Sequence, residues 1–254
     1  GSDKINLQNL PRGSKLRTAI RAPEGQQLFI ADLSNIEARM LAWLAKEGDL
    51  LDAFAQGRDV YCEFASQIYG RTITKENTLE RYVGKTAILG LGYGMGHQKF
   101  QDTLKAGSPS VDVSDSTAAQ IVTQYRTTYS NITILWARAK DLLFNMMSPN
   151  MFGTKYGPLE VTRNRLILPN KMSLYYPQLK YIGGEFLYDT SKGKIRTYGP
   201  RLAENIIQAL ARIVITDQML EIQAMPQCDV VMQVHDEIIA IGSEINADVT
   251  MDRA

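Results

Sequence analysis

The sequence has few of the residues that build soft metal sites or covalent cross-links. Its 254 residues include only two cysteines, Cys62 and Cys228, and two histidines. Two isolated cysteines exclude a disulfide framework and a cysteine-based zinc site. We therefore expect two reduced, packed thiols, and any metal ion would have to be held by carboxylates.

Long apolar runs are also absent. No run approaches the ~18 residues that a membrane span needs, and the N-terminal stretch GSDKINLQNLPRGSKLR has no hydrophobic region like that of a secretory signal. We expect a cytoplasmic protein with no membrane partner. Internal repeats and low-complexity tracts are missing too, whereas 44% of the residues are hydrophobic, which allows a sizeable core. A compact body with an inserted lobe fits this pattern.

The net charge is close to zero, at +1, so it gives no overall sign of a nucleic-acid partner. The charge is uneven, however, because residues 1–22 carry five cations and the single acid Asp3. Such a segment suits a phosphate backbone, but taken alone it is more often a solvated chain end.

Hydrophobic periodicity predicts an order of elements along the chain. Residues 28–31 form a short strand that leads into a helix over residues 34–44, and residues 50–148 are mostly helical. Residues 151–198 consist of short aromatic and β-branched runs broken by Pro, Gly and Asn, which predict strands and hairpins. A long amphipathic helix follows over residues 201–222. The expected fold class is α+β.

The first candidate site residue is Asp32, in the stretch DLSNIEAR. An acid at the carboxyl end of a strand lies where open sheets tend to bind ligands, and a carboxylate there can hold Mg²⁺. The alternative is local, since Ser34 and Glu37 have the spacing of a capping box, which would explain both residues without a function.

The second candidate is the stretch RYVGKTAILGLGYGMG, in which Arg81, Lys85, Leu89 and Tyr93 recur every four residues. On a helix these side chains form one slanting stripe. Arg81 and Lys85 could bind a polyphosphate, and Leu89 and Tyr93 would lie beside a base and sugar. The alternative is an amphipathic helix with a solvated basic end and a glycine-rich stop.

The third candidate is VMQVHDEIIA, residues 231–240, where three charged or titratable residues interrupt an apolar segment. Alternation predicts a strand, so the acidic pair lies either in a tight hairpin turn or inside the sheet. Two adjacent buried carboxylates would cost several kcal/mol unless they were compensated. A divalent metal would remove that cost, whereas an exposed hairpin tip is the structural alternative.

Taken in order, the three stretches resemble the three polymerase motifs of family A, or DNA polymerase I-like, DNA polymerases. DLSNIEAR is similar to the family's D-Y-S-Q-I-E-L-R, RYVGKTAILGLGYGMG to its R-x₃-K-x₃-F-x₃-Y-G-M helix, and MQVHDEI to its M-Q-V-H-D-E-L. NLQNLP at residues 6–11, YRTTYSNI at residues 125–132 and Gln208 add to the resemblance. It covers nearly the whole chain and has a phage-like character.

The resemblance implies metal-ion catalysis of nucleotidyl transfer. Asp32 and Asp236 would bind two Mg²⁺ ions, for which Mn²⁺ can substitute, with the carbonyl of Leu33 as a further ligand and Glu237 as a supporting acid. In that scheme one ion lowers the pKa of the primer 3′-hydroxyl and the other holds the triphosphate and the leaving pyrophosphate.

The resemblance also implies how the dNTP and the primer-template DNA would be bound. Arg81 and Lys85 would bind the triphosphate, with Lys85 as proton donor to pyrophosphate, while Leu89, Tyr93 and Glu37 would surround the base and sugar. Glu37 would exclude ribonucleotides by blocking a 2′-hydroxyl. The residues expected to contact DNA are His235 at the primer end and Gln208, Asn6, Gln8, Asn9 and Arg12 on template and primer.

The sequence departs from the family pattern at particular points. Leu89 stands where Phe or Tyr is usual, and Glu204 stands where an Asn is common. The resemblance implies a palm at residues 1–50 and 151–254 and fingers at residues 51–150, with the second motif on a helix over about residues 78–92. A thumb and an exonuclease domain are expected to be missing from this chain. Two alternatives remain: a nucleic-acid-binding remnant with little activity and a relative of the single-subunit RNA polymerases.

Overall fold

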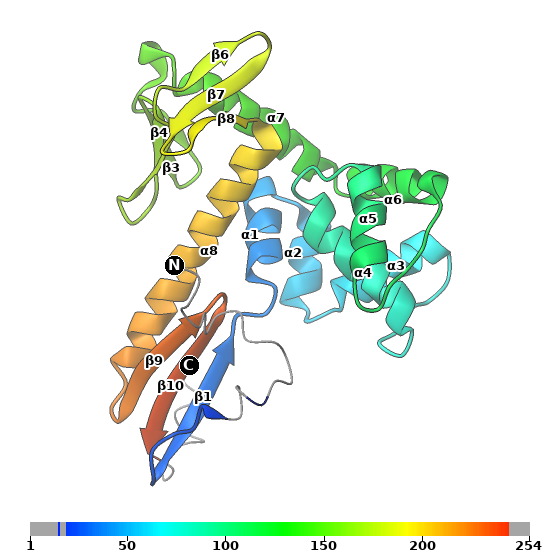
Figure 1. The fold of residues 1–254 in the computed structure, drawn as a ribbon, viewed down its shortest axis with the longest axis vertical. Coiled ribbons are helices and arrows are strands. Elements are labelled where there is room, and N and C mark those ends of the chain that lie inside the picture. The colour runs from blue at the N-terminus through cyan, green and yellow to red at the C-terminus, as the bar shows by residue number, and fades with distance from the viewer. Residues whose placement is uncertain (1–14, 16–18, 244–254) are drawn as a thin grey trace. The chain divides into compact units, whose positions relative to one another are not determined.

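The computed structural model describes residue 15 and residues 19–243 (Figure 1). Over the described residues, the first part of the chain has one strand followed by seven α-helices. These are β1 (Gln26–Asp32), α1 (Ile36–Ala45), α2 (Gly48–Ala55), α3 (Val60–Tyr69), α4 (Thr78–Leu91), α5 (His97–Ala106), α6 (Asp115–Thr128) and α7 (Ser130–Asn145).

The second part is rich in strands and contains one long helix. After the 3₁₀ turn η3 (Pro149–Met151) come β2 (Lys155–Tyr156), β3 (Leu159–Thr162), β4 (Arg165–Ile167), β5 (Ser173–Tyr175), β6 (Lys180–Ile182), β7 (Glu185–Thr190), β8 (Gly193–Thr197), α8 (Gly199–Gln223), β9 (Cys228–Val234) and β10 (Glu237–Ser243).

Contacts divide the chain into two compact units. The first consists of Gly1–Ile36 with Ala211–Ala254, and the second is Glu37–Leu210, so the boundary at the C-terminal side falls inside α8. The palm and fingers ranges inferred from the sequence follow other boundaries and stay a prediction.

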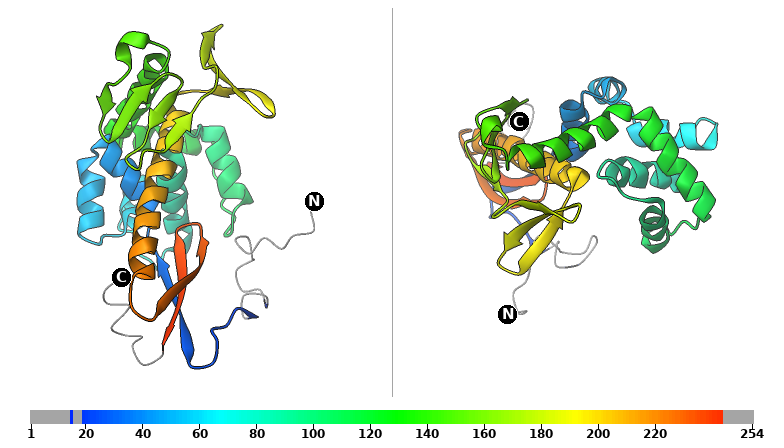
Figure 2. Two further views of the ribbon diagram at one scale, coloured as in Figure 1. Left: turned by 90° about the vertical axis from the view of Figure 1, so that its left-hand side faces the viewer. Right: turned by 90° about the horizontal axis from the view of Figure 1, so that it is seen from above.

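The first unit is built on an antiparallel sheet in the order β1-β10-β9. The second half of α8 packs on this sheet, as the left view of Figure 2 shows. The buried core between the helix and the sheet consists of Ile215, Ile222, Cys228, Ile238 and Ala240, with Phe29 and Leu33 packed against them. β10 is the central strand of this sheet, which explains why residues 238–241 form an apolar run.

The helices of the second unit pack closely through small residues and aromatic rings. A Cβ at Gly84 of α4 would lie 2.2 Å from the backbone oxygen of Tyr61, so the glycine allows α3 and α4 to approach. Phe64, Tyr125 and Tyr129 form an aromatic cluster with ring centroids 5.0 to 5.6 Å apart. The glycine thus brings α4 close to α3, and the aromatic cluster packs α3 against α6.

Two small antiparallel sheets complete the second unit, in the orders β2-β3-β4-β5 and β6-β7-β8. Both lie beside α7 and the first turns of α8 in Figure 1. Phe144 of α7 packs against Tyr181 and Phe186 of the second sheet, at 5.0 and 4.7 Å between ring centroids. We refer to residues 155–198, which contain both sheets, as the β-lobe.

Several sequence predictions are confirmed. The α+β class holds, the helical stretch after residue 50 and the strands after residue 151 are present, and the expected long helix is α8. Both cysteines are free and buried. Within the described part of the chain, no helix has the length and apolar character needed to cross a membrane.

Candidate active site

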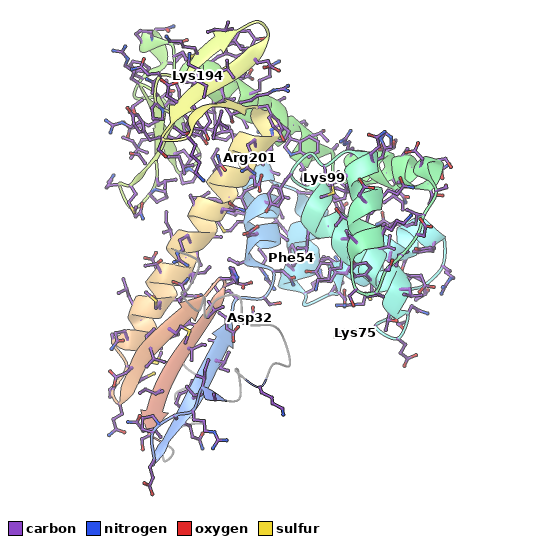
Figure 3. The ribbon with its side chains drawn as sticks, viewed as in Figure 1. Asp32, Phe54, Lys75, Lys99, Lys194 and Arg201 are labelled. Carbon is purple, nitrogen blue, oxygen red and sulfur yellow. The ribbon has the colours of Figure 1, made fainter. Side chains whose placement is uncertain are left out.

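The end of the sheet in the first unit brings Asp32 beside the turn that contains Asp236. Asp32 is the last residue of β1 and pairs with Glu237, the first residue of β10. The next amide along the chain, Leu33 N–H, donates a hydrogen bond of 3.1 Å to the carbonyl oxygen of Asp236. The two expected metal-binding aspartates therefore lie at the same end of one sheet, and Asp32, labelled in Figure 3, is exposed there.

The acidic pair lies at the tight turn between β9 and β10, with Asp236 in the turn and Glu237 as the first residue of β10. His235 and Asp236 form a two-residue turn, because Val234 pairs with Glu237 on either side of it. His235 has a φ of +55°, as the first central residue of such a tight turn often requires. Glycine usually takes this conformation, so a histidine held there carries backbone strain.

Glu237 lies next to Asp32 on the same face of the sheet, since directly paired residues of antiparallel strands project to one side. Like charges in that position repel each other. A bound cation would offset this repulsion, so the pair is a feature that the proposed metal site would explain.

The two aspartates at this end of the sheet could supply part of the ligand set of a Mg²⁺ ion. Among the residues that the structure describes, no group of three or more His, Cys, Asp and Glu side chains could hold a metal ion. Mg²⁺ sites that act on nucleotides use one or two carboxylates, with substrate phosphates and water as the remaining ligands. Asp32 and Asp236 supply that number, so they match a metal that binds together with its substrate.

Three residues of the predicted stripe, Arg81, Lys85 and Leu89, lie on one side of α4, whereas the fourth, Tyr93, lies beyond the end of the helix. Lys85 and Leu89 are exposed and Arg81 is partly exposed, whereas Val83, Gly84, Ala87, Ile88 and Leu91 of the opposite side are buried. The helix ends at Leu91, and Tyr93 continues in a tight turn in which its N–H bonds to the carbonyl of Gly90 at 3.3 Å. The solvent-facing side of α4 thus carries two cations and one apolar side chain.

Arg81 is bound by a residue that the sequence interpretation missed, Asp59. Arg81 Nε donates to Asp59 Oδ2 at 2.9 Å, and Arg81 Nη2 lies 2.9 Å from the same oxygen. The other oxygen, Oδ1, accepts bonds of 3.1 Å from the N–H groups of Tyr61 and Cys62 and so caps α3. The guanidinium also lies over the Tyr61 ring, 5.3 Å from its centroid.

This environment fixes the charge of Asp59. Burial raises the pKa of its carboxyl group, but the hydrogen bonds from the Cys62 N–H and from Arg81 outweigh burial and hold that pKa below its usual value. The pair is therefore ionic at neutral pH. An Asp directly before a helical run was a detectable N-cap signal, but nothing in the sequence linked it to Arg81.

Tyr93 and Glu37 are also brought together. The Tyr93 hydroxyl donates to Glu37 Oε2 at 3.2 Å. Burial and the nearby Glu37 carboxylate raise the pKa of Tyr93, so the phenol stays protonated and can donate.

The capping-box alternative for Ser34 and Glu37 does not fit the helix start. α1 begins at Ile36, and Asn35 has a φ of +58°, whereas a capping box would need Asn35 in helical conformation. Helix capping by that motif therefore does not explain Glu37.

The structure places two of the residues expected to contact DNA, and their DNA contacts stay a prediction. Gln208 lies exposed on α8, and His235 is exposed in its turn. Glu204, one turn before Gln208, accepts a 2.7 Å bond from Arg201 Nη1. Asn6, Gln8, Asn9 and Arg12 lie outside the described residues.

The comparisons with known proteins decide the family. The model of DNA polymerase family A matches residues 1–250. This chain belongs to DNA polymerase family A. The motif resemblance seen in the sequence is thereby confirmed at the level of the family.

Relatives in family A include phage and bacterial enzymes. The chain is 28% identical to the DNA polymerase of Bacillus phage SP02, over 88% of this chain and 37% of that protein. It is 27% identical to DNA polymerase I of Pseudomonas aeruginosa, over 94% of this chain and 24% of that protein. The chain thus spans well under half the length of these two relatives.

A solved structure supports the same fold. The polymerase domain of Pol1 from M. smegmatis, in complex with a DNA primer-template and dNTP, matches 97% of this chain and 40% of that chain. The TM-score is 0.60 and the sequence identity is 22%. At this identity the match shows that the two chains share a fold.

Proposed function

We propose that this chain is the core of a template-directed DNA polymerase, which adds dNTPs to a primer 3′-hydroxyl and releases pyrophosphate. The observation that carries the proposal is the placement of Asp32 and Asp236 at one end of the β1-β10-β9 sheet, in a chain of family A. Two carboxylates beside each other at a sheet end suit divalent-metal chemistry.

Asp32 and Asp236 would hold the metal, and Glu237 would add negative charge beside Asp32. When bound there, Mg²⁺ would lower the pKa of the attacking hydroxyl and neutralise charge on the triphosphate. The protein's own task at this end is to fix the carboxylates. The Leu33 N–H bond to Asp236 supports this task, because it ties the end of β1 to the hairpin turn.

Arg81 and Lys85 would bind the phosphates of the incoming nucleotide. A guanidinium offers phosphate a planar set of donors, and an ammonium supplies a mobile point charge that can also give a proton to the leaving pyrophosphate. Asp59 would act as a positioning residue, since it engages Nε and Nη2 of Arg81 and so fixes the direction of the guanidinium.

Glu37 and Tyr93 would select the sugar. The hydrogen bond between them holds the Glu37 carboxylate in one orientation. A carboxylate fixed in this way would leave no room for a 2′-hydroxyl, so dNTPs would be used in preference to NTPs.

Primer extension tests the proposal. The chain is incubated with a primed template, Mg²⁺ and either dNTPs or NTPs, beside the variant Asp236→Ala. We expect extension by the wild type with dNTPs only, and loss of that extension in the variant. Equal extension by both proteins would contradict the proposal, and extension with NTPs alone would favour the RNA polymerase alternative.

A binding measurement on the same DNA separates the remaining alternative. If neither protein extends the primer but both bind primed DNA equally well, the chain is better described as a nucleic-acid-binding remnant. Mn²⁺ is included as a second metal, because it accepts the same oxygen ligands.

A further inference from the structure

The β-lobe concentrates positive charge that the proposed active site does not use. Residues 155–198 carry eight lysines and arginines against three acids, Glu160, Glu185 and Asp189, in a chain whose net charge is only +1. All eight cations are exposed, whereas the three acids are partly buried. Figure 3 labels one of these cations, Lys194 on β8.

The register of the β2-β3-β4-β5 sheet separates its two faces. Leu159, Val161 and Leu166 project to one face and are at most 1% exposed. The other face carries Lys155, which pairs with Glu160, and Arg165, which pairs with Tyr175. Residues 160, 162 and 165 belong to this second face because the side chains of paired residues share a side.

Tyr175 is the distinctive residue of this outer face. Its side chain is 61% exposed, although it lies in a strand and next to a cation in the neighbouring strand. Arg165 Nε donates to Thr162 Oγ1 at 3.1 Å, which keeps the guanidinium stem on the sheet. Exposed cations alone would suffice for solubility, whereas an exposed Tyr ring adds apolar surface and so suggests a binding role.

The lobe is mounted firmly enough to present such a face. Asn205 of α8 donates to the Tyr176 hydroxyl at 2.8 Å, and the Asn164 N–H bonds to the carbonyl of Met146 at 3.0 Å. Tyr176 also packs against Tyr188 at 5.0 Å between ring centroids, which connects the two small sheets.

We propose that the outer face of the β2-β3-β4-β5 sheet, with Lys155, Arg165 and Tyr175, is a binding surface for single-stranded DNA. Lys155 and Arg165 supply charge for the phosphates, and Tyr175 supplies a platform on which an unpaired base can stack. Stacking requires a base that is free of its partner strand, so the ring selects single strands over a duplex. An acidic protein segment would match the charge, but it need not carry a flat group that stacks on the exposed ring.

The surface is tested with a fluorescently labelled short oligo(dT), whose binding is followed by anisotropy over a range of salt concentrations. Lys155→Glu with Arg165→Glu is compared with Lys75→Glu and Lys105→Glu, two exposed lysines outside the β-lobe. Both pairs change the net charge equally, so the long-range electrostatic effect is matched. Thermal unfolding checks that each variant is folded.

We expect the β-lobe pair to weaken oligo(dT) binding by at least about tenfold more than the control pair. The slope of log K against log salt should also become shallower by about 0.7 for each phosphate that the protein no longer neutralises. Equal weakening by both pairs would overturn the proposal, because it would mean that only total charge matters.

Tyr175 gives an independent measurement. Tyr175→Ala should weaken oligo(dT) binding by about tenfold, the loss expected for one stacked base, while Tyr175→Phe retains it. Tyr69→Ala, which removes an exposed ring from α3, is the control. A loss with Tyr175→Phe as large as with Tyr175→Ala would contradict stacking. Preferential binding of an acidic peptide over oligo(dT) would also contradict the proposal.

These measurements use no primer, metal or nucleotide. Failure of the single-strand surface would therefore leave the proposed polymerase activity untouched, and failure of primer extension would leave this surface untouched.

Discussion

Asp59 divides its two carboxylate oxygens between the start of α3 and the guanidinium of Arg81. One oxygen accepts the Tyr61 and Cys62 N–H groups, and the other lies 2.9 Å from both Nε and Nη2 of Arg81. The same side chain thus caps one helix and orients a cation on the next. If Arg81 binds the triphosphate, its direction is set before the nucleotide arrives.

Replacing Asp59 with Asn should disturb nucleotide binding more than folding. Asn keeps an oxygen that can cap α3, but it removes the charge that holds Arg81. We expect the KM for dNTP to rise by about tenfold with a smaller change in kcat, because a misplaced guanidinium weakens binding of the phosphates. Steady-state primer extension measures both constants.

Asp52→Asn is the matched control, since it removes an exposed carboxylate from the neighbouring helix α2. An unchanged KM in Asp59→Asn, or an equal rise in Asp52→Asn, would show that Asp59 does not position Arg81 for the nucleotide.

Asp59 should also make stability depend on pH. Its pKa in the folded protein is lower than the ordinary value of 3.8, so folding favours the ionised form. The resulting stabilisation is complete above that ordinary value and is lost as the pH falls through the folded pKa. The difference in Tm between wild type and Asp59→Asn should therefore be constant from pH 7 to about pH 5 and shrink below about pH 4. A difference that grows on acidification would contradict this assignment.

The parts of the site that follow from local patterns were predictable from the sequence. Helical spacing was enough to place Arg81, Lys85 and Leu89 on one side of α4, because the period of a helix is fixed. The convergence of Asp32 with Asp236 depends on pairing between strands far apart in the chain, which no local pattern encodes. The motif resemblance supplied that relationship, and the register of β1 with β10 shows it in this structure.

Other features could not be predicted from the sequence, because one local pattern is compatible with more than one structure. Asp59 has the signature of a simple helix cap, so its bond to Arg81, 22 residues later, had no separate signal. The start of α1 was misplaced for a similar reason, since Ser34 and Glu37 have capping-box spacing but Asn35 adopts a positive φ. When a local pattern is compatible with two conformations, the surrounding packing selects one of them, and the pattern alone does not show which.

Two glycines of α4 should respond oppositely to alanine. At Gly84 the new Cβ would lie 2.2 Å from the backbone oxygen of Tyr61, which cannot move without shifting α3. We expect Gly84→Ala to lower the free energy of unfolding by about 1–3 kcal/mol, despite the better helix propensity of Ala.

Gly90 provides the internal control for that prediction. There the closest atom to a new Cβ is the terminal methyl of Met95, at 3.0 Å on a flexible side chain. Gly90→Ala should be neutral or stabilising by up to about 1 kcal/mol. Urea unfolding of both variants measures the difference, and equal effects would mean that close packing of α3 on α4 does not explain Gly84.

The bond between Tyr93 and Glu37 predicts a coupled effect on sugar selection. Glu37→Ala removes the carboxylate proposed to exclude a 2′-hydroxyl, so the ratio of kcat/KM for NTP to that for dNTP should rise by about tenfold or more. Tyr93→Phe keeps the ring and the carboxylate but removes the hydrogen bond that orients Glu37, so it should relax selection by a smaller factor. In the double variant the tyrosine substitution should add little, because its effect acts through Glu37.

Primer extension with each nucleotide type completes this double-mutant cycle. Additive effects of the two substitutions would contradict the coupling, and an unchanged sugar preference in Glu37→Ala would contradict the assignment of Glu37 as the selecting residue.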